Sequence, residues 1–152
     1  MAIWAADCAE RVLPFFEKAY PKDRRPRNAI ATCRTWVRTG VFTMADIRGA
    51  SLAAHAAARG AKENNAACFA ARAAGQAVAT AHVPQHACGG AYYALKAIAA
   101  AGPAHAEVKI VKERNWQSQR LPKNLRREIM NRIIIKKRDD GIFIKIQKGK
   151  DF

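Results

Sequence analysis

The chain has 152 residues, half of them hydrophobic, and a formal net charge of +15 at pH 7. This length can bury a core without staples, and the positive charge favours acidic partners, whether nucleic acid, an anionic membrane surface or an acidic protein. The four cysteines form no CxxC pair, which argues against a zinc site of the usual spacing and favours reduced thiols in a helical core: Cys8, Cys33, Cys68 and Cys88.

The chain opens with an amphipathic helix. Trp4, Cys8 and Val12 recur at helical spacing, and the pattern continues to Ala19. Pro14 lies inside this pattern and lacks a backbone N–H, so we expect it to kink or split the helix.

A second helix is predicted to begin near Pro26 and to end at Gly40, which is placed as a C-terminal cap. Thr43 and Asp46 have the spacing of a capping box and start a third helix that ends near Gly60.

Alanine dominates the middle of the chain, from residue 45 to residue 106. Because alanine side chains are small and favour helix, this block predicts tightly packed helices at the centre of a bundle. We expect a fourth helix from about Asn64 to Val83, a break at Pro84 and a fifth helix from Gln85 to Ala101.

The end of the chain changes character. A sixth helix is predicted over 106–120 and a short seventh over about 123–132, followed by two β-branched runs around an Asp-Gly turn at Asp140-Gly141. We therefore predict an all-α fold, a single-domain alanine-rich bundle of six or seven helices over 1–132. A basic β-hairpin tail over 133–152 should pack on the bundle or at an interface.

No basic segment followed by an apolar run opens the chain, and Arg59, Lys62 and Arg72 interrupt the alanine block before it could span a membrane. We expect a soluble cytoplasmic protein. The acidic residues are scattered, and the sequence has no P-loop, no GxGxxG and no nucleophile elbow around Ser51 or Ser118. These patterns favour a protein that is not an enzyme and has no cofactor.

His82 and His86 are four residues apart, a spacing that can hold a metal on one helical face. Pro84 disturbs that helix, and carboxylates are nearly absent nearby, so we expect no metal, with these two histidines as weak candidates. A structural role at the bend or a contact with a partner is favoured over a metal-dependent enzyme.

Polar and basic stripes are predicted on the third and fourth helices. They form either a basic groove or an ordinary solvated face. The third helix carries Arg48, Leu52, His55 and Arg59, and the fourth carries Asn65, Phe69, Arg72 and Gln76.

The tail from Arg126 to Lys150 interleaves isoleucine with lysine and arginine. A basic β-ribbon can bind nucleic acid through counterion release, whereas edge lysines also serve simply to discourage aggregation. The hairpin could also pair two copies of the chain into a homodimer.

Several segments resemble, in order, a family of small helical putative immunity proteins of bacterial polymorphic toxin systems, described as immunity protein five-like. The resemblance is carried by the segments 4–14, 20–30, 53–59, 80–87 and 113–126, whose tryptophan, proline and histidine positions are not a matter of composition. The hairpin beyond Arg126 departs from the family pattern.

This resemblance implies an all-α protein that binds and neutralises a cognate toxin without catalysis. Together with the positive charge, it predicts a toxin with an acidic surface as the partner, and no membrane. The candidate partner-binding residues are Arg48, His55, Arg59, Arg72, Gln76, His82 and His86. Nucleic-acid binding by the basic C-terminal region is the alternative.

Overall fold

The computed structural model describes residues 1–138 and 141–147, and it confirms a mostly all-α fold with a short hairpin. The described part contains seven α-helices, a 3₁₀ turn and two strands. These are α1 (Ala2–Ala19), α2 (Arg25–Thr39), α3 (Met44–Gly60), α4 (Asn65–Ala79), α5 (His86–Ala101), η1 (Pro103–His105), α6 (Ala106–Arg120), α7 (Lys123–Asn131), β1 (Ile133–Arg138) and β2 (Gly141–Ile146).

The predicted caps are confirmed. Thr43 Oγ1 accepts a hydrogen bond from the Asp46 N–H at 3.1 Å and starts α3, and Gly40 ends α2 with a positive φ of 70° that favours glycine. Pro14 does not split α1, which runs unbroken from Ala2 to Ala19.

The predicted end of the fourth helix at Val83 is wrong. Helix α4 ends at Ala79, and residues 80–85 form turns that lead into α5. The first of these turns has the tighter i to i+3 pattern, with the Thr80 N–H donating to the Ala77 carbonyl at 3.3 Å. His82 therefore lies in the connection and not on a continuous helix with His86.

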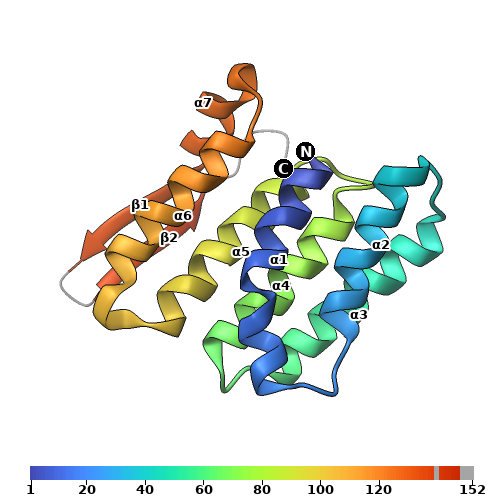
Figure 1. The fold of residues 1–152 in the computed structure, drawn as a ribbon, viewed down its shortest axis with the longest axis horizontal. Helices are drawn as coiled ribbons and strands as arrows, with labels where there is room; N and C mark the ends of the chain where they lie inside the picture. Colours follow the sequence, from blue (N-terminus) through green and yellow to red (C-terminus); the bar gives the residue numbers. More distant parts are fainter. Residues whose placement is uncertain (139–140, 148–152) are drawn as a thin grey trace.

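Helix α4 is the centre of the bundle and packs against α1, α2, α3 and α5. In Figure 1, α1 crosses in front of α4, with α2 and α3 on one side and α5 on the other. Four neighbours fit around one helix because its buried residues are small: Ala67, Cys68, Ala70, Ala71, Ala73, Ala74, Gly75, Ala77, Val78 and Ala79.

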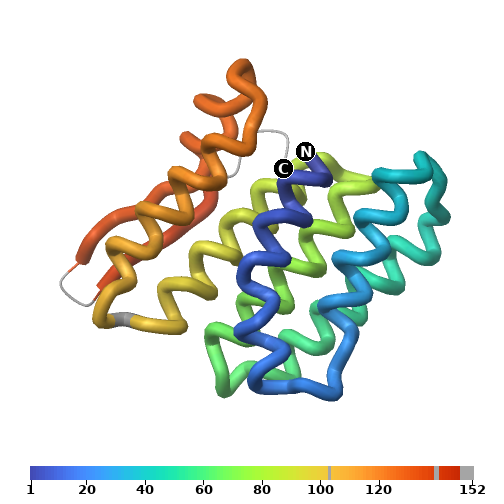
Figure 2. Tube along the Cα trace, in the orientation of Figure 1, coloured from blue at the N-terminus to red at the C-terminus, as the bar shows by residue number. Residues whose placement is uncertain are grey.

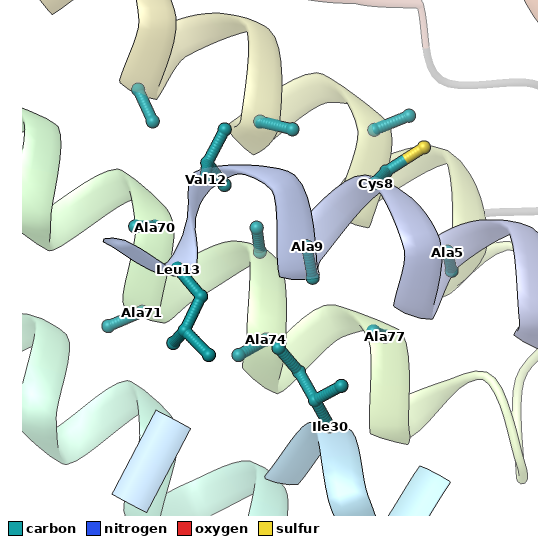
Figure 3. Packing of buried hydrophobic residues seen from close by; sticks show 14 of the residues in the cluster. Ala5, Cys8, Ala9, Val12, Leu13, Ile30, Ala70, Ala71, Ala74 and Ala77 are labelled. Atoms are coloured by element: carbon teal, nitrogen blue, oxygen red, sulfur yellow. The ribbon is translucent and has the colours of Figure 1, made fainter. Parts of the chain in front are cut away.

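Larger side chains from the surrounding helices fill the space that these small residues leave. Figure 3 shows Leu13 of α1 and Ile30 of α2 both pointing towards Ala74 of α4. Leu13 and Ile30 are 2% and 4% exposed, and Ala74 is fully buried. The core thus combines large residues on the outer helices with alanine on the central one.

Hydrogen bonds and an ion pair connect α6 to α1 and α5. The Trp4 indole N–H donates to the Gln117 carbonyl at 2.8 Å, while Arg11 pairs with the buried Glu113 at 2.8 Å. Gln117 Nε2 also donates to the Ala91 carbonyl of α5 at 3.3 Å. These bonds join α1, α5 and α6, elements that are distant in sequence.

The hairpin packs beside α5 through β2. Figure 2 shows α6, α7 and the hairpin together on the α5 side of the molecule, away from α2 and α3. The strands are antiparallel, with Ile135 opposite Ile144, and Ile144 is buried while the next residue, Lys145, is exposed. The Asp139-Asp140 part of the predicted turn lies outside the described residues.

No helix in the described part of the chain is long and apolar enough to cross a membrane.

Replacing Ala74 by leucine tests the packing around α4. Because Ala74 is surrounded by Leu13 and Ile30, we expect Ala74→Leu to destabilise the fold by about 1–3 kcal/mol through overpacking. Urea unfolding followed by circular dichroism measures the change. Ala100→Leu, at an exposed position of α5, is the matched control and should change stability little. Equal stability of the two variants would contradict the close packing.

The cysteines should be unreactive in the folded protein. All four are free and buried, and burial raises the pKa of the Cys33 thiol to about 11 and that of Cys8 well above its ordinary value. We expect iodoacetamide at pH 8 to leave Cys8 and Cys33 unmodified until guanidinium chloride unfolds the chain. Mass spectrometry of the peptides provides the measurement, and rapid labelling of either thiol in the native protein would contradict the prediction.

Candidate functional site

A pocket of about 180 Å³ opens where α3, α4, the α4–α5 connection and the start of α5 meet. It contains five of the seven predicted partner-binding residues. We call it the histidine pocket, and its lining residues are Arg48, Ser51, Leu52, His55, Gln76, Ala79, His82 and His86. Three residues of the stripe predicted on the third helix therefore meet one residue, Gln76, of the stripe predicted on the fourth helix.

Close contact between α3 and α4 forms one wall of the histidine pocket. Ser51 Oγ donates to the Gly75 carbonyl at 3.1 Å, and a Cβ on Gly75 would lie only 2.9 Å from His55 Nε2. The glycine therefore makes the room in which the half-buried His55 ring lies.

The opposite wall depends on a second glycine. His86 Nδ1 lies 2.7 Å from Gln76 Oε1, and since an amide oxygen only accepts, Nδ1 carries the proton in this arrangement. A Cβ on Gly89 would lie 2.7 Å from the same Gln76 oxygen. The His82 and His86 rings are 5.3 Å apart, with His82 exposed at the mouth.

The histidines are surrounded by positive charge. Burial lowers the pKa of His55, and Arg72, Arg59 and His86 lower it further. Burial also lowers the pKa of His86, with a further contribution from His82. Both imidazoles are therefore neutral at pH 7. Arg59 and Arg72 lie outside the pocket lining but close enough to act on His55.

The arginines of this region differ from most arginines of α1 and α2. Arg11 of α1 pairs with Glu113 at 2.8 Å, and Arg34 of α2 pairs with Asp7 at 2.9 Å. Within the described residues, no carboxylate lies within salt-bridge distance of the three arginines on α3 and α4, which are Arg48, Arg59 and Arg72. Glu63 is the sole acid in the sequence from residue 47 to residue 106.

A band of aromatic and cationic side chains lies on α4 and α5 and includes Arg72. The Arg72 guanidinium lies 5.7 Å from the Tyr93 ring centre, and Tyr93 stacks with Phe69 at 6.2 Å. Lys96 lies 4.3 Å above the Phe69 ring, and Tyr92 meets Tyr93 edge-on at 4.9 Å. Local sequence patterns do not connect Lys96 of α5 with Phe69 of α4, because the pairing of these helices is a tertiary contact.

The two weak metal candidates, His82 and His86, are not part of a larger group of metal ligands in the described part of the chain. Among the residues that the structure describes, no group of three or more His, Cys, Asp or Glu could hold a metal ion. His82 and His86 have each other and Gln76 as neighbours, and an amide and two imidazoles without a carboxylate or thiolate make a poor metal site.

Some of the basic tail is engaged within the chain. Lys137 pairs with Glu107 at 2.9 Å, and the Arg138 guanidinium lies 3.9 Å from the Phe143 ring centre. Arg114 of α6 donates to the Met130 carbonyl at 2.8 Å and so holds α7 in place.

A larger hollow of about 500 Å³ lies between α2 and the start of α3. Its wall includes Trp36 and Phe42, whose rings meet edge-on at 5.6 Å, and the exposed Val41. Asp46 is the one ionisable residue in its lining, so this hollow has less recognition chemistry than the histidine pocket.

In a comparison with known proteins, one family model matches most of the chain. The model of the Imm-5 like putative immunity protein family matches residues 1–124. Neither the search of curated proteins nor the search of solved structures found a match. The matched range includes the whole histidine pocket and ends before the hairpin.

Replacing Gly75 by alanine should move His55 while leaving the fold in place. Alanine favours helix over glycine by roughly 0.5–1 kcal/mol, which opposes the cost of displacing the end of a side chain. We expect the His55 ring to move towards water, and its pKa to rise because burial no longer lowers it as strongly. Imidazole NMR titration measures this change, with Gly49→Ala, where a Cβ meets open space, as the control. An unchanged His55 pKa would contradict the proposed fit.

Proposed function

Because the chain belongs to the Imm-5 like putative immunity protein family, we propose that it is a non-catalytic immunity protein that neutralises a cognate bacterial toxin by direct binding. We further propose that the toxin contacts one face of the bundle, which we call the α3–α5 face. This face consists of Arg48, His55, Arg59, Arg72, Gln76, His82 and His86.

The observation that carries this proposal is the unbalanced charge of the α3–α5 face. Its arginines lie on the one part of the bundle where the sequence supplies almost no acid. A like-charged surface of this kind favours an acidic partner, and electrostatic attraction speeds the encounter between the two proteins.

The neighbouring aromatic band supports the same assignment. Interface hot spots are rich in tyrosine and arginine, and Tyr92, Tyr93 and Arg72 are half-buried side chains that offer both ring faces and charge. The aromatic band would supply apolar contact beside the charged pocket.

The chemistry of the pocket supports binding over catalysis. The Ser51 hydroxyl donates its proton to the Gly75 carbonyl at 3.1 Å and not to a histidine, so it is not arranged as an activated nucleophile. His86 is held by an amide and not by a carboxylate, so nothing raises its basicity.

Co-expression with the toxin domain encoded by the neighbouring reading frame tests the proposed function. We expect the two proteins to purify as a stable complex and the immunity protein to restore growth of cells that make the toxin. A toxin that remains free and lethal in the presence of the folded protein would overturn the proposal.

Charge reversal tests the proposed face. We expect Arg48→Glu combined with Arg59→Glu to weaken toxin binding by about tenfold or more, mainly through slower association, because neither exposed arginine has an acidic partner among the described residues. Surface plasmon resonance at two salt concentrations measures both rates. Lys22→Glu, in the loop between α1 and α2, is the matched control and should change the association rate less. Equal effects of the two changes would place the toxin elsewhere.

The same protein should be tested against a short DNA duplex. Salt-sensitive binding that is lost when Lys136 and Lys145 are both changed to glutamate would favour the nucleic-acid alternative over toxin binding. Light scattering of the free protein tests the predicted homodimer through the hairpin.

A further inference from the structure

We propose that the histidine pocket is a binding site for a single carboxylate, supplied by an aspartate or glutamate side chain of the toxin. This inference rests on the proposed function for the identity of the partner, and on the pocket alone for the chemistry of the ligand.

The arginines around the pocket favour an anion. Arg48 and Arg59 lie on α3 and Arg72 lies on α4. The described residues place no carboxylate within salt-bridge distance of these arginines. An anion entering the pocket would therefore meet cations without displacing an internal partner.

The size of the pocket suits the end of an acidic side chain. Its volume of about 180 Å³ equals that of on the order of six water molecules. This space holds a carboxylate with its methylene groups but not a nucleobase with its sugar. The Leu52 and Ala79 side chains supply an apolar wall for the methylenes, while the donors are polar.

The pocket also has the donors that a carboxylate requires. The Arg48 guanidinium can donate to both oxygens. His86, whose Nδ1 proton is directed at Gln76, can donate from Nε2 once the ring is protonated. Gly75 and Gly89 leave room for His55 and Gln76, so the arrangement depends on two positions where a Cβ would collide with the ring or the amide. These features distinguish the pocket from a loose cluster of surface cations.

The pocket suits a phosphate less well than a carboxylate. Phosphate sites at helix N-termini use free backbone N–H groups, but the first three N–H groups of α5 are occupied. They donate to the Val83, Pro84 and Gln85 carbonyls at 3.0, 3.1 and 3.1 Å. The remaining donors are side chains around a small space, which favours a monovalent carboxylate.

Binding of a carboxylate should depend on pH. In the free protein, burial lowers the pKa values of His55 and His86. Arg72, Arg59 and His86 lower that of His55 further, and the neighbouring His82 lowers that of His86 further. The negative charge of a bound anion favours the protonated imidazoles and raises these pKa values, so protonation of the histidines and anion binding promote each other. The affinity should therefore increase as the pH falls from 7.5 to 6.

Titration of the full-length protein with sodium acetate, followed by amide and imidazole NMR, tests the inference. At ionic strength held constant with sodium chloride, we expect saturable shifts at His55, His86 and Gly75. The apparent affinity should be about threefold or more higher at pH 6 than at pH 7.5. Chemical-shift changes that do not saturate, or that are spread evenly over the basic surface, would contradict a carboxylate site in the pocket.

Two matched variants sharpen the test. Arg48→Gln should weaken acetate binding by about fivefold or more, because it removes the one arginine in the lining. Arg38→Gln, at an exposed position of α2, should leave it unchanged. Tighter binding of inorganic phosphate than of acetate at the same residues would overturn the assignment to a carboxylate.

These experiments can contradict the carboxylate site and the proposed function separately. Saturable acetate binding by a protein that does not bind the toxin would support the carboxylate site and contradict the proposed immunity function. Conversely, the protein could bind the toxin with an affinity that Arg48→Gln does not change, while its pocket does not respond to acetate. That result would support the immunity function and contradict the carboxylate site.

Discussion

The packing of α4 against four other helices is the constraint on which the rest of the structure depends. A helix can have so many close neighbours only if its side chains are small, and the buried residues of α4 are alanine, glycine, cysteine and valine. Leucine, isoleucine and phenylalanine on α1 and α2 supply the apolar volume that alanine does not. This arrangement brings α3 and α5 close to the same helix from different sides.

The histidine pocket is a consequence of that closeness. Gly75 of α4 accommodates His55 from α3, and Gln76, the next residue of α4, meets His86 of α5. A bulkier central helix would push α3 and α5 apart and separate these side chains. The residues that permit tight packing thus also create the polar hollow at its edge.

The placement of acids divides the molecule into two kinds of surface. Acids on α1, α6 and the α1–α2 loop pair with arginines of α1 and α2, as Glu113 does with Arg11 and Asp23 with Arg25. The α3–α5 face has almost none, so its positive charge remains available to a partner. The hairpin lies outside the family match and packs beside α5, where Ile144 is buried.

The sequence by itself determined the helical class, the caps at Gly40 and Thr43, the hairpin and the list of candidate side chains. These follow from local patterns: apolar periodicity, capping chemistry and β-branched runs around a turn. Only the tertiary structure decided that His55, Gln76 and His86 share one pocket and that Arg72 of α4 lies over the ring of Tyr93 of α5. These contacts depend on how α3, α4 and α5 pack against one another. A local sequence pattern does not specify which side chains on different helices come into contact. The early end of α4 at Ala79 has the same origin, because alanine favours helix wherever it occurs and cannot itself mark where the chain must turn to begin α5.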